Sequence, residues 1–154
     1  METMKNNVKA IPEGYHTVTP YLIVDGAAKL IEFVKQAFDA KEMLRMAGPD
    51  GRIGHTEIRI GDSMLMLSDS RDPWKPMPAM LYVYVEDVDA TYQRALQAGA
   101  TSVSEPKDQF YGDRSGRIVD PFGHIWNLAS HIEDVSPEEM DRRMAAFATG
   151  DCAS

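Results

Sequence analysis

Histidine and acidic side chains at short spacing are the first candidates for chemistry in this sequence. His55 and Glu57 lie two residues apart, and residues two apart on a β-strand point to the same face. An imidazole and a carboxylate on one face could supply two ligands to a divalent metal, but such a site needs a third. His16 and Asp69 are candidates that the sequence does not place beside the pair. The alternative is a polar strand face on which Arg59 continues the row, so we expect no metal cofactor.

Other reactive side chains give little support for covalent chemistry. The single cysteine, Cys152, lies near the C-terminus, no serine sits in a nucleophile elbow, and no glycine-rich phosphate loop is present. Asp113, Arg114 and Arg117 form a charged group. An arginine there could clamp a carboxylate or phosphonate, but an Asp113–Arg114 ion pair that fixes a loop is the interpretation we favour.

Composition and charge exclude several classes of partner. The chain has 154 residues, of which 44% are hydrophobic and 26% charged, as in an ordinary globular domain. No stretch approaches the length of a membrane span, and the first residues lack the apolar core of a secretory signal. A net charge of −8 argues against nucleic acid. We therefore expect a cytoplasmic protein with neither a nucleic-acid nor a membrane partner.

The elements that must position these residues follow one another in a repeated order. The first copy is expected to have a strand at 15–24, a helix capped by Asp25, and strands at 41–47, 52–60 and 63–68. A proline-rich connector follows at 72–78. The second copy is expected to have a strand at 80–85, a helix at 88–98 between Asp87 and Gly99, and strands at 101–104, 113–119 and 124–130. A loop is expected at 105–112.

Landmarks at a similar spacing, 60 to 65 residues, indicate that the two copies arose by duplication. Asp25 and Asp87 are 62 residues apart, and so are Gly61 and Gly123. The tripeptide Gly-Arg-Ile at 51–53 recurs at 116–118. Several landmarks in the same order favour a structural repeat over chance.

The C-terminal tail carries a strong helix start. Ser136 is suited to the N-cap, Pro137 to the first helical position and Glu139 to the third, which is a capping box. A sparse apolar stripe follows at Met140, Met144 and Phe147. We expect a helix that packs on its own domain or on a second subunit.

Side chains on alternate strand positions fall into two sets. One set is aliphatic and belongs under the helices, and His124 falls on that side, which favours a structural role. The other set mixes methionine, tyrosine and polar residues, and its expected ligand-binding members are Thr19, Tyr21, Met64, Met66, Met80, Tyr82, Tyr84 and Asn127. Such residues adapt to small organic molecules, so we favour a ligand cavity over a second, subunit-facing core. Tyr111 and Phe110 are expected to lie over it as lid aromatics.

Four segments resemble the vicinal oxygen chelate superfamily, also called the glyoxalase/bleomycin resistance/dioxygenase fold, and within it the PhnB-like branch. They are PYLIVDGAAKLIEFVKQAFDA (20–40), PDGRIGHTEIRIGDSMLMLSD (49–69), LYVYVEDVDATYQRALQAGAT (81–101) and DQFYGDRSGRIVDPFGHIWNLASH (108–131). The resemblance implies an α+β fold in which two tandem βαβββ modules form a curved mixed sheet around a cavity. Module one would span about 15–70 and module two about 79–131 of a single domain ending at 131, with the helical tail at 132–154 outside the match. It also implies a homodimer.

The same resemblance implies where a metal would be held. Metal-dependent members place histidines and carboxylates at positions that match Thr19, Met66, Met80 and Asn127. Thioethers, a hydroxyl and an amide make a poor site for a divalent metal. We therefore expect a protein that binds a small organic ligand without the usual metal. The alternatives are a glyoxalase-like lyase, isomerase or dioxygenase with an atypical metal site at His55 and Glu57, an enzyme that uses acid–base chemistry without a metal, or a structural dimer with a filled cavity.

Overall fold

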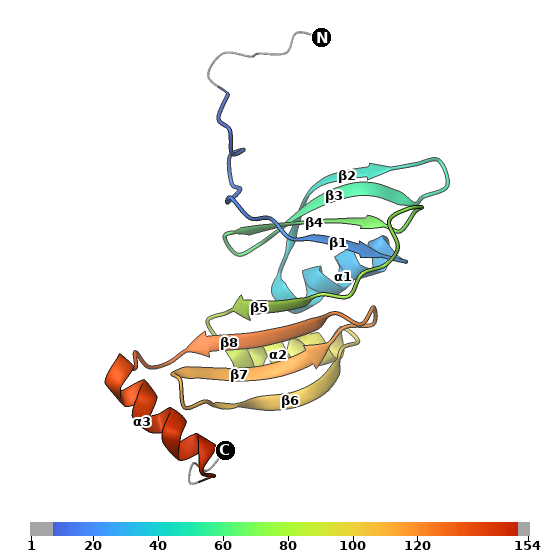
Figure 1. Cartoon of the computed structure of the whole chain (residues 1–154). Helices are drawn as coiled ribbons and strands as arrows, with labels where there is room; N and C mark the ends of the chain where they lie inside the picture. Colours follow the sequence, from blue (N-terminus) through green and yellow to red (C-terminus); the bar gives the residue numbers. More distant parts are fainter. Residues whose placement is uncertain (1–7, 151–154) are drawn as a thin grey trace. The chain divides into compact units, whose positions relative to one another are not determined.

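Two copies of a strand–helix–three-strand unit follow one another in the computed structural model, which describes residues 8–150 (Figure 1). The first copy contains β1 (Tyr21–Val24), α1 (Ala27–Phe38), β2 (Lys41–Ala47), β3 (Ile53–Ile60) and β4 (Ser63–Asp69). The second contains β5 (Met80–Tyr84), α2 (Val88–Gln97), β6 (Thr101–Asp108), β7 (Asp113–Val119) and β8 (Ile125–His131), followed by α3 (Pro137–Ala148). Cys152, whose role the sequence leaves open, lies outside the described residues.

The strands form two four-stranded mixed sheets with the same topology. Their orders are β1-β4-β3-β2 and β5-β8-β7-β6, and in each sheet the first pair is parallel and the others are antiparallel. The α+β class and the two βαβββ modules with a C-terminal helix are therefore confirmed, and each module forms its own four-stranded sheet. The chain forms two units: Gln36–Phe38 belongs with the second, and the remainder up to Met77 with the first.

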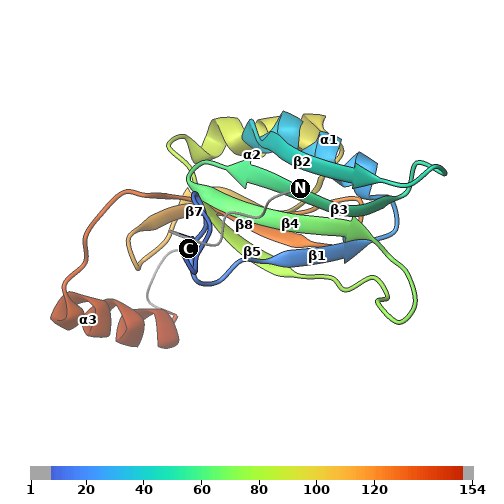
Figure 2. The ribbon, with the colours of Figure 1, turned by 90° about the horizontal axis from the view of Figure 1, so that it is seen from above.

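In the first unit, α1 covers one face of the sheet (Figure 2). Its apolar stripe is fully buried at Leu30, Ile31 and Val34 and faces side chains that alternate along the strands. These strand side chains are Leu22, Val24, Ile58, Leu65 and Leu67. Burying each large aliphatic side chain contributes roughly 1.5–3 kcal/mol, so this layer holds the unit together.

The N-terminus of α1 corrects one sequence expectation. The N-cap residue is Gly26, with φ 118°, and Asp25 makes no capping hydrogen bond. The carboxylate of Asp69, at the end of β4, instead accepts from the backbone N–H groups of Gly26 and Ala27 at 2.9 and 2.8 Å. Its second oxygen accepts from the N–H of Ile53 at 2.7 Å. A carboxylate from a distant strand thus replaces the local cap, a relationship that spacing along the chain does not reveal.

The second unit follows the sequence expectations more closely. Asp87 caps α2 by accepting from the N–H of Ala90 at 3.1 Å, and Gly99 follows the helix with φ 113°. Asp120 organises the last turn, because one carboxylate accepts from two backbone N–H groups of that turn and from the buried indole N–H of Trp126 at 2.8 Å. His124 is buried, and its Nδ1 accepts from the N–H of Ala79 at 2.9 Å. The structural role expected for His124 is confirmed.

Two strands differ from their expected bounds by more than one residue. β1 begins only at Tyr21, because Pro20 has no N–H to donate to a neighbouring strand. The carbonyl of Pro20 still accepts a hydrogen bond from Met66 N–H at 3.0 Å. β6 continues through the expected loop to Asp108. Pro106 fits within it because β6 is an edge strand, whose pairing with β7 shifts register between Ser104 and Lys107.

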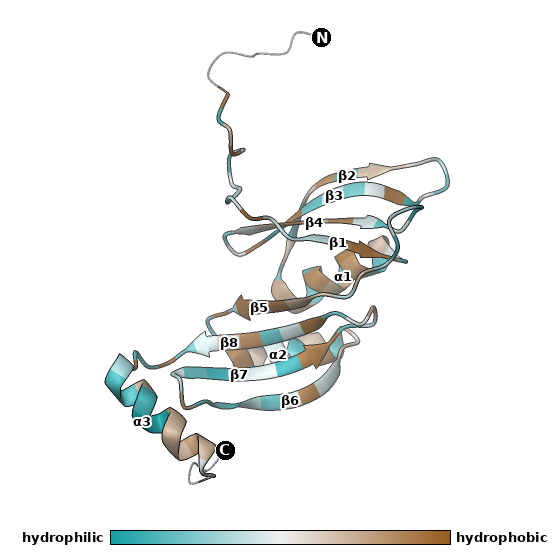
Figure 3. Ribbon diagram, in the orientation of Figure 1, coloured by the Kyte–Doolittle hydropathy of each residue, from teal (hydrophilic) through white to brown (hydrophobic). Residues whose placement is uncertain are grey.

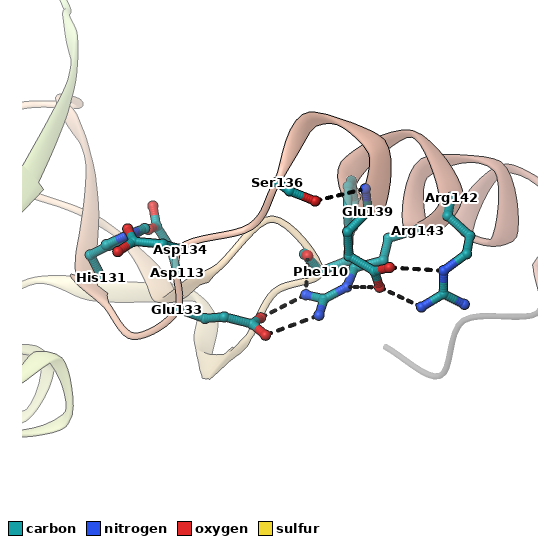
Figure 4. A network of polar contacts seen from close by, with 9 residues as sticks. All are labelled: Phe110, Asp113, His131, Glu133, Asp134, Ser136, Glu139, Arg142 and Arg143. Atoms are coloured by element: carbon teal, nitrogen blue, oxygen red, sulfur yellow. Dashed lines mark hydrogen bonds and ion pairs between the residues drawn. The ribbon is translucent and has the colours of Figure 1, made fainter.

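The tail helix α3 lies beside the second sheet rather than on it (Figures 1 and 2), and none of its residues is buried. One half of the predicted capping box is present, since the Ser136 hydroxyl accepts from Glu139 N–H at 3.2 Å, whereas the Glu139 carboxylate accepts from Arg142 and Arg143 (Figure 4). Figure 3 shows a hydrophilic first half and a more apolar second half of α3. Among residues 8–150, none of the helices is both long and apolar enough to span a membrane.

Candidate functional site

Each sheet has one face under its helix and one face opposite, which we call the open face. On the first open face, β-pairing sets Tyr21 beside Met66 and Met66 beside Glu57. On the second, it sets Tyr82 beside Asn127 and Asn127 beside Arg117. The two rows occupy equivalent positions of the duplicated topology. Both begin with a tyrosine, and they differ at the two positions that follow.

The sequence-predicted ligand residues fall mainly on these open faces. Met80, Tyr82 and Tyr84 project from one side of β5 and are 59%, 46% and 62% exposed. On the first unit, Tyr21 is 44% exposed, Met66 is half-buried and Met64 is buried. Thr19 lies before β1, where its hydroxyl reaches the carbonyl of His16 at 3.5 Å. Tyr111 lies in the loop before β7, with its ring edge-on to Phe110 at 5.3 Å.

A buried carboxylate underlies the exposed tyrosines of the second unit. Asp113, at the start of β7, is 4% exposed, and its Oδ2 accepts from the hydroxyls of Tyr82 at 2.6 Å and Tyr84 at 3.0 Å. Its Oδ1 lies 2.8 Å from Nδ1 of His131. The expected Asp113–Arg114 ion pair is wrong. Side chains alternate along β7, so Arg114 points to the helix side and binds Asp89 and Asp108 instead.

Electrostatics keep this carboxylate ionised and the phenols protonated. Burial raises the pKa of Asp113, but the hydrogen bonds from Tyr82, His131 and Tyr84 outweigh it and leave the pKa below its ordinary value. Burial and the same hydrogen bond raise the pKa of Tyr82, and the hydrogen bond to Asp113 raises that of Tyr84. The rings of Tyr82 and Tyr84 are 5.2 Å apart. Sequence reasoning selected both tyrosines but missed Asp113 as their partner.

Arginine and asparagine continue the second open face. The Nε of Arg117 donates to Oδ1 of Asn127 at 2.6 Å, which orients a guanidinium that is otherwise exposed. Within the second unit the open face therefore runs from aromatic side chains on β5 to a polar pair on β8 and β7.

The first open face carries a different cluster, centred on His55. Its Nδ1 lies 3.0 Å from the hydroxyl of Tyr21, and its Nε2 lies 2.9 Å from Oε2 of Glu57. The hydroxyl of Tyr15 donates to the other oxygen of Glu57. Hydrogen bonds from Tyr15 and then His55 hold the pKa of Glu57 below its ordinary value. Glu57 is therefore bound by Tyr15 and His55, and not by Arg59, which continues the same row.

The donor chemistry does not fit a divalent metal. Both ring nitrogens of His55 and both oxygens of Glu57 are engaged by neighbouring side chains. Among residues 8–150, no three His, Cys, Asp or Glu side chains are grouped so that they could hold a metal ion. The positions that match the family's metal ligands offer only a hydroxyl and a thioether in the first unit, Thr19 and Met66. In the second unit they offer a thioether and an amide, Met80 and Asn127. That the protein works without a metal stays a prediction.

Comparison with known proteins gives both a family and a fold. The sequence model of the Glyoxalase/Bleomycin resistance protein/Dioxygenase superfamily matches residues 15–128. An uncharacterized protein of Mycobacterium tuberculosis is 39% identical over 160 residues, covering 97% of this chain and 91% of the relative. An uncharacterized protein of Mycobacterium bovis is 40% identical over 144 residues, covering 86% of this chain and 95% of the relative.

Solved structures share the fold at lower identity. TioX from Micromonospora sp. ML1 matches with a TM-score of 0.66 and 23% identity, over 76% of this chain and 99% of TioX. A glyoxalase/bleomycin resistance protein/dioxygenase family enzyme from Burkholderia phytofirmans PsJN matches with a TM-score of 0.61 and 16% identity, over 74% and 97% of the two chains. At these identities the likeness shows the fold alone.

Proposed function

Because this chain belongs to the Glyoxalase/Bleomycin resistance protein/Dioxygenase superfamily, we propose that it binds a small organic molecule on the open face of its second unit, without a divalent metal. One observation carries the proposal. Three consecutive outward side chains of β5 (Met80, Tyr82 and Tyr84) leave about half or more of their surface exposed beside the buried, ionised Asp113. Single exposed apolar residues are ordinary, but neighbouring exposed apolar side chains beside polar groups mark interaction and ligand-binding sites.

The geometry supports a ligand with hydrogen-bond donors. Tyr82 and Tyr84 donate their hydroxyl protons to Asp113, so their oxygens are left as acceptors. A ligand N–H or O–H group would complete this arrangement. The tyrosine rings and the Met80 thioether suit a planar, apolar body, and burying that body contributes roughly 25 cal/mol per Å². Arg117 and Asn127 would meet its polar end.

The proposal is tested by screening planar aromatic amines, phenols and heterocycles by thermal shift, followed by calorimetry on every compound that binds. Met80→Glu places a charge in the apolar row and should lower the affinity for the compounds that bind at least tenfold. Tyr82→Phe should lower the affinity about five- to tenfold, since it removes one hydrogen-bonding oxygen worth roughly 1 kcal/mol.

Tyr92→Phe is the matched control. It removes a tyrosine hydroxyl that bonds Ser102 at 2.6 Å on the helix side of the same unit, and affinity should stay at the wild-type value. If Met80→Glu and Tyr82→Phe bind every compound as tightly as Tyr92→Phe does, the proposed face is not the binding site.

Finer assignments belong to the same proposal. The segment GDSMLMLSD at 61–69 supports the PhnB-like branch, and the net charge of −8 supports a partner set without nucleic acid.

Exposed apolar residues of α3, Met144 and Phe147, support a homodimer. Sedimentation of the full chain tests the dimer, with a single species at the monomer mass as the contrary result. A cytoplasmic location is likewise proposed, and cell fractionation tests it.

A further inference from the structure

We propose that Tyr21, His55 and Glu57 on the first open face form a proton relay that catalyses acid–base chemistry, the isomerisation of a small carbonyl compound by proton transfer. The three side chains form one continuous chain of hydrogen bonds. The Tyr21 hydroxyl lies 3.0 Å from Nδ1 of His55, and Nε2 of His55 lies 2.9 Å from Oε2 of Glu57. The proposal concerns the first unit and does not rest on ligand binding by the second.

The direction of the relay follows from what each group can donate. An ionised Glu57 only accepts hydrogen bonds, so Nε2 of His55 must carry a proton and donate it. In a neutral imidazole the other nitrogen is then an acceptor, so the Tyr21 hydroxyl donates to Nδ1. This is the order of groups in a Ser-His-Asp triad, with a phenol in place of the serine hydroxyl.

Tyr15 holds the carboxylate end in place. Its hydroxyl donates to the Glu57 oxygen that His55 does not use, and burial and this contact raise the pKa of Tyr15 to about 12. Tyr15 therefore remains a donor, and Glu57 remains charged at neutral pH. A fixed carboxylate orients the imidazole and stabilises the imidazolium that forms when His55 takes a proton. Glu57 is thus a positioning residue.

Tyr21 is the group that a substrate would meet. It lies at the edge of the open face, is 44% exposed, and has the half-buried Met66 as its neighbour in the sheet. Arg59 follows Glu57 two residues along β3, on the same face, and supplies positive charge for a developing oxyanion. The other row neighbour of Glu57 is Leu44, which is apolar.

The proposed reaction balances without any co-reactant. The Tyr21 oxygen takes the proton of a C–H bond next to a carbonyl as its own proton passes to Nδ1 of His55. The electron pair of that bond forms the enolate. The Tyr21 hydroxyl then returns one proton to the substrate, either to the same carbon, which gives exchange, or to the enolate oxygen, which gives the enol isomer. The proton on Nδ1 of His55 passes back to the Tyr21 oxygen and restores the relay.

The first test is a nitrogen NMR measurement of the wild-type protein. His55 should appear as the neutral tautomer with Nε2 protonated and Nδ1 bare at pH 8, and Tyr21→Phe should shift the Nδ1 signal. The opposite tautomer, or an Nδ1 signal that Tyr21→Phe leaves unmoved, would overturn the relay whatever the substrate.

The second test follows deuterium exchange at the carbon next to the carbonyl, using phenylpyruvate, pyruvate and dihydroxyacetone in D₂O. Wild type should accelerate the exchange of at least one of them. Tyr21→Phe and His55→Gln should lower that acceleration by about 10²–10⁴-fold, the range of general acid–base catalysis. Glu57→Gln should leave the tautomer of His55 unchanged but remove most of the acceleration of deuterium exchange, because the imidazolium then lacks a counter-charge.

His16→Gln is the control, since it removes an imidazole outside the relay and should keep the wild-type rate. Thermal unfolding of each variant separates loss of the relay from loss of the fold. If none of the three compounds exchanges faster with wild type than with His55→Gln, the catalytic assignment is wrong. Binding at Tyr82 and Met80 is measured separately, so failure of one proposal leaves the other standing.

Discussion

Arg143 on α3 donates from its Nη1 to the carbonyl oxygen of Phe110 at 2.9 Å, which joins the tail helix to the loop before β7 (Figure 4). The same guanidinium makes two contacts with the Glu133 carboxylate, at 2.6 and 3.0 Å, and a third with Glu139. The ring of Phe147 lies 5.0 Å from that of Phe110. Since no residue of α3 is buried, these contacts account for how the helix is held.

Replacing Arg143 should therefore release α3. We expect Arg143→Ala to speed amide exchange across α3 about tenfold, because it removes the hydrogen bonds to Phe110, Glu133 and Glu139 together. Arg142→Ala is the control, because among the residues labelled in Figure 4 Arg142 contacts only Glu139, and its side chain is mostly exposed. Hydrogen exchange resolved by peptide distinguishes them, and equal protection in the two variants would contradict this account.

Gly112 is expected to tolerate no side chain. Its φ is 102°, and a Cβ there would lie 2.2 Å from the carbonyl oxygen of Glu133, while its own carbonyl accepts from Ile132 and Glu133. Gly112→Ala should lower the free energy of unfolding by more than about 2 kcal/mol, from strain and a displaced segment together. Gly123→Ala has a similar φ of 87° with open space around it, so it should cost only the backbone strain, about 1 kcal/mol. Urea unfolding measures both, and equal losses would refute the steric argument.

Asp69 should matter more to stability than Asp25. Removing its carboxylate by Asp69→Ala leaves three backbone N–H groups without their acceptor, which should cost roughly 2–4 kcal/mol. Asp25→Ala, at an exposed carboxylate, should change stability by less than about 0.5 kcal/mol. Thermal unfolding of the Asp69→Ala and Asp25→Ala variants measures both losses of stability.

Acid should weaken the same contact. Burial raises the pKa of Asp69, but the backbone N–H groups and Arg52 outweigh it and lower the pKa overall. A lowered pKa contributes stability that is present above the ordinary carboxyl pKa and is lost as pH falls through the folded-state value. Wild type should therefore lose this contribution in acid, and Asp69→Asn should show a shallower loss.

His131 should give the opposite pH dependence. Hydrogen bonds to Asp113 and Asp134 raise the pKa of His131 above its ordinary value. A raised pKa contributes stability that is fully present below the unfolded-state value and is lost as pH rises through the folded-state value. Thermal unfolding from pH 5 to 9 should show this decrease in wild type and not in His131→Gln. If the stability of His131→Gln falls between pH 5 and 9 as steeply as that of wild type, the charged pair is not stabilising.

Local signals account for what the sequence predicted well. β2 and β7 have the predicted bounds, and α2 begins after Asp87 and ends before Gly99, because turn and capping residues act within a few positions. The N-cap of α3 at Ser136 formed for the same reason. The duplication was visible because equivalent landmarks keep their order.

Contacts between distant segments account for what was missed. Asp69 replaces Asp25 at the start of α1 from more than forty residues away, and only the fold brings them together. Pro106 marked a loop, although an edge strand accommodates it. In the candidate site, strand alternation placed Tyr82 and Tyr84 on one face. It did not reveal that Asp113 lies between their hydroxyls, nor that Tyr21 and His55 meet.

The matched rows of the two open faces carry a consequence for the history of the chain. Equivalent positions hold Tyr21 and Tyr82 at the first place, but Glu57 and Arg117, of opposite charge, at the third. No helix covers these positions, so a substitution there leaves the buried layer of its sheet undisturbed. The duplication that the repeated landmarks indicate thus gave two copies that share an architecture and differ in the chemistry of their open faces, with a tyrosine at the first place of both rows.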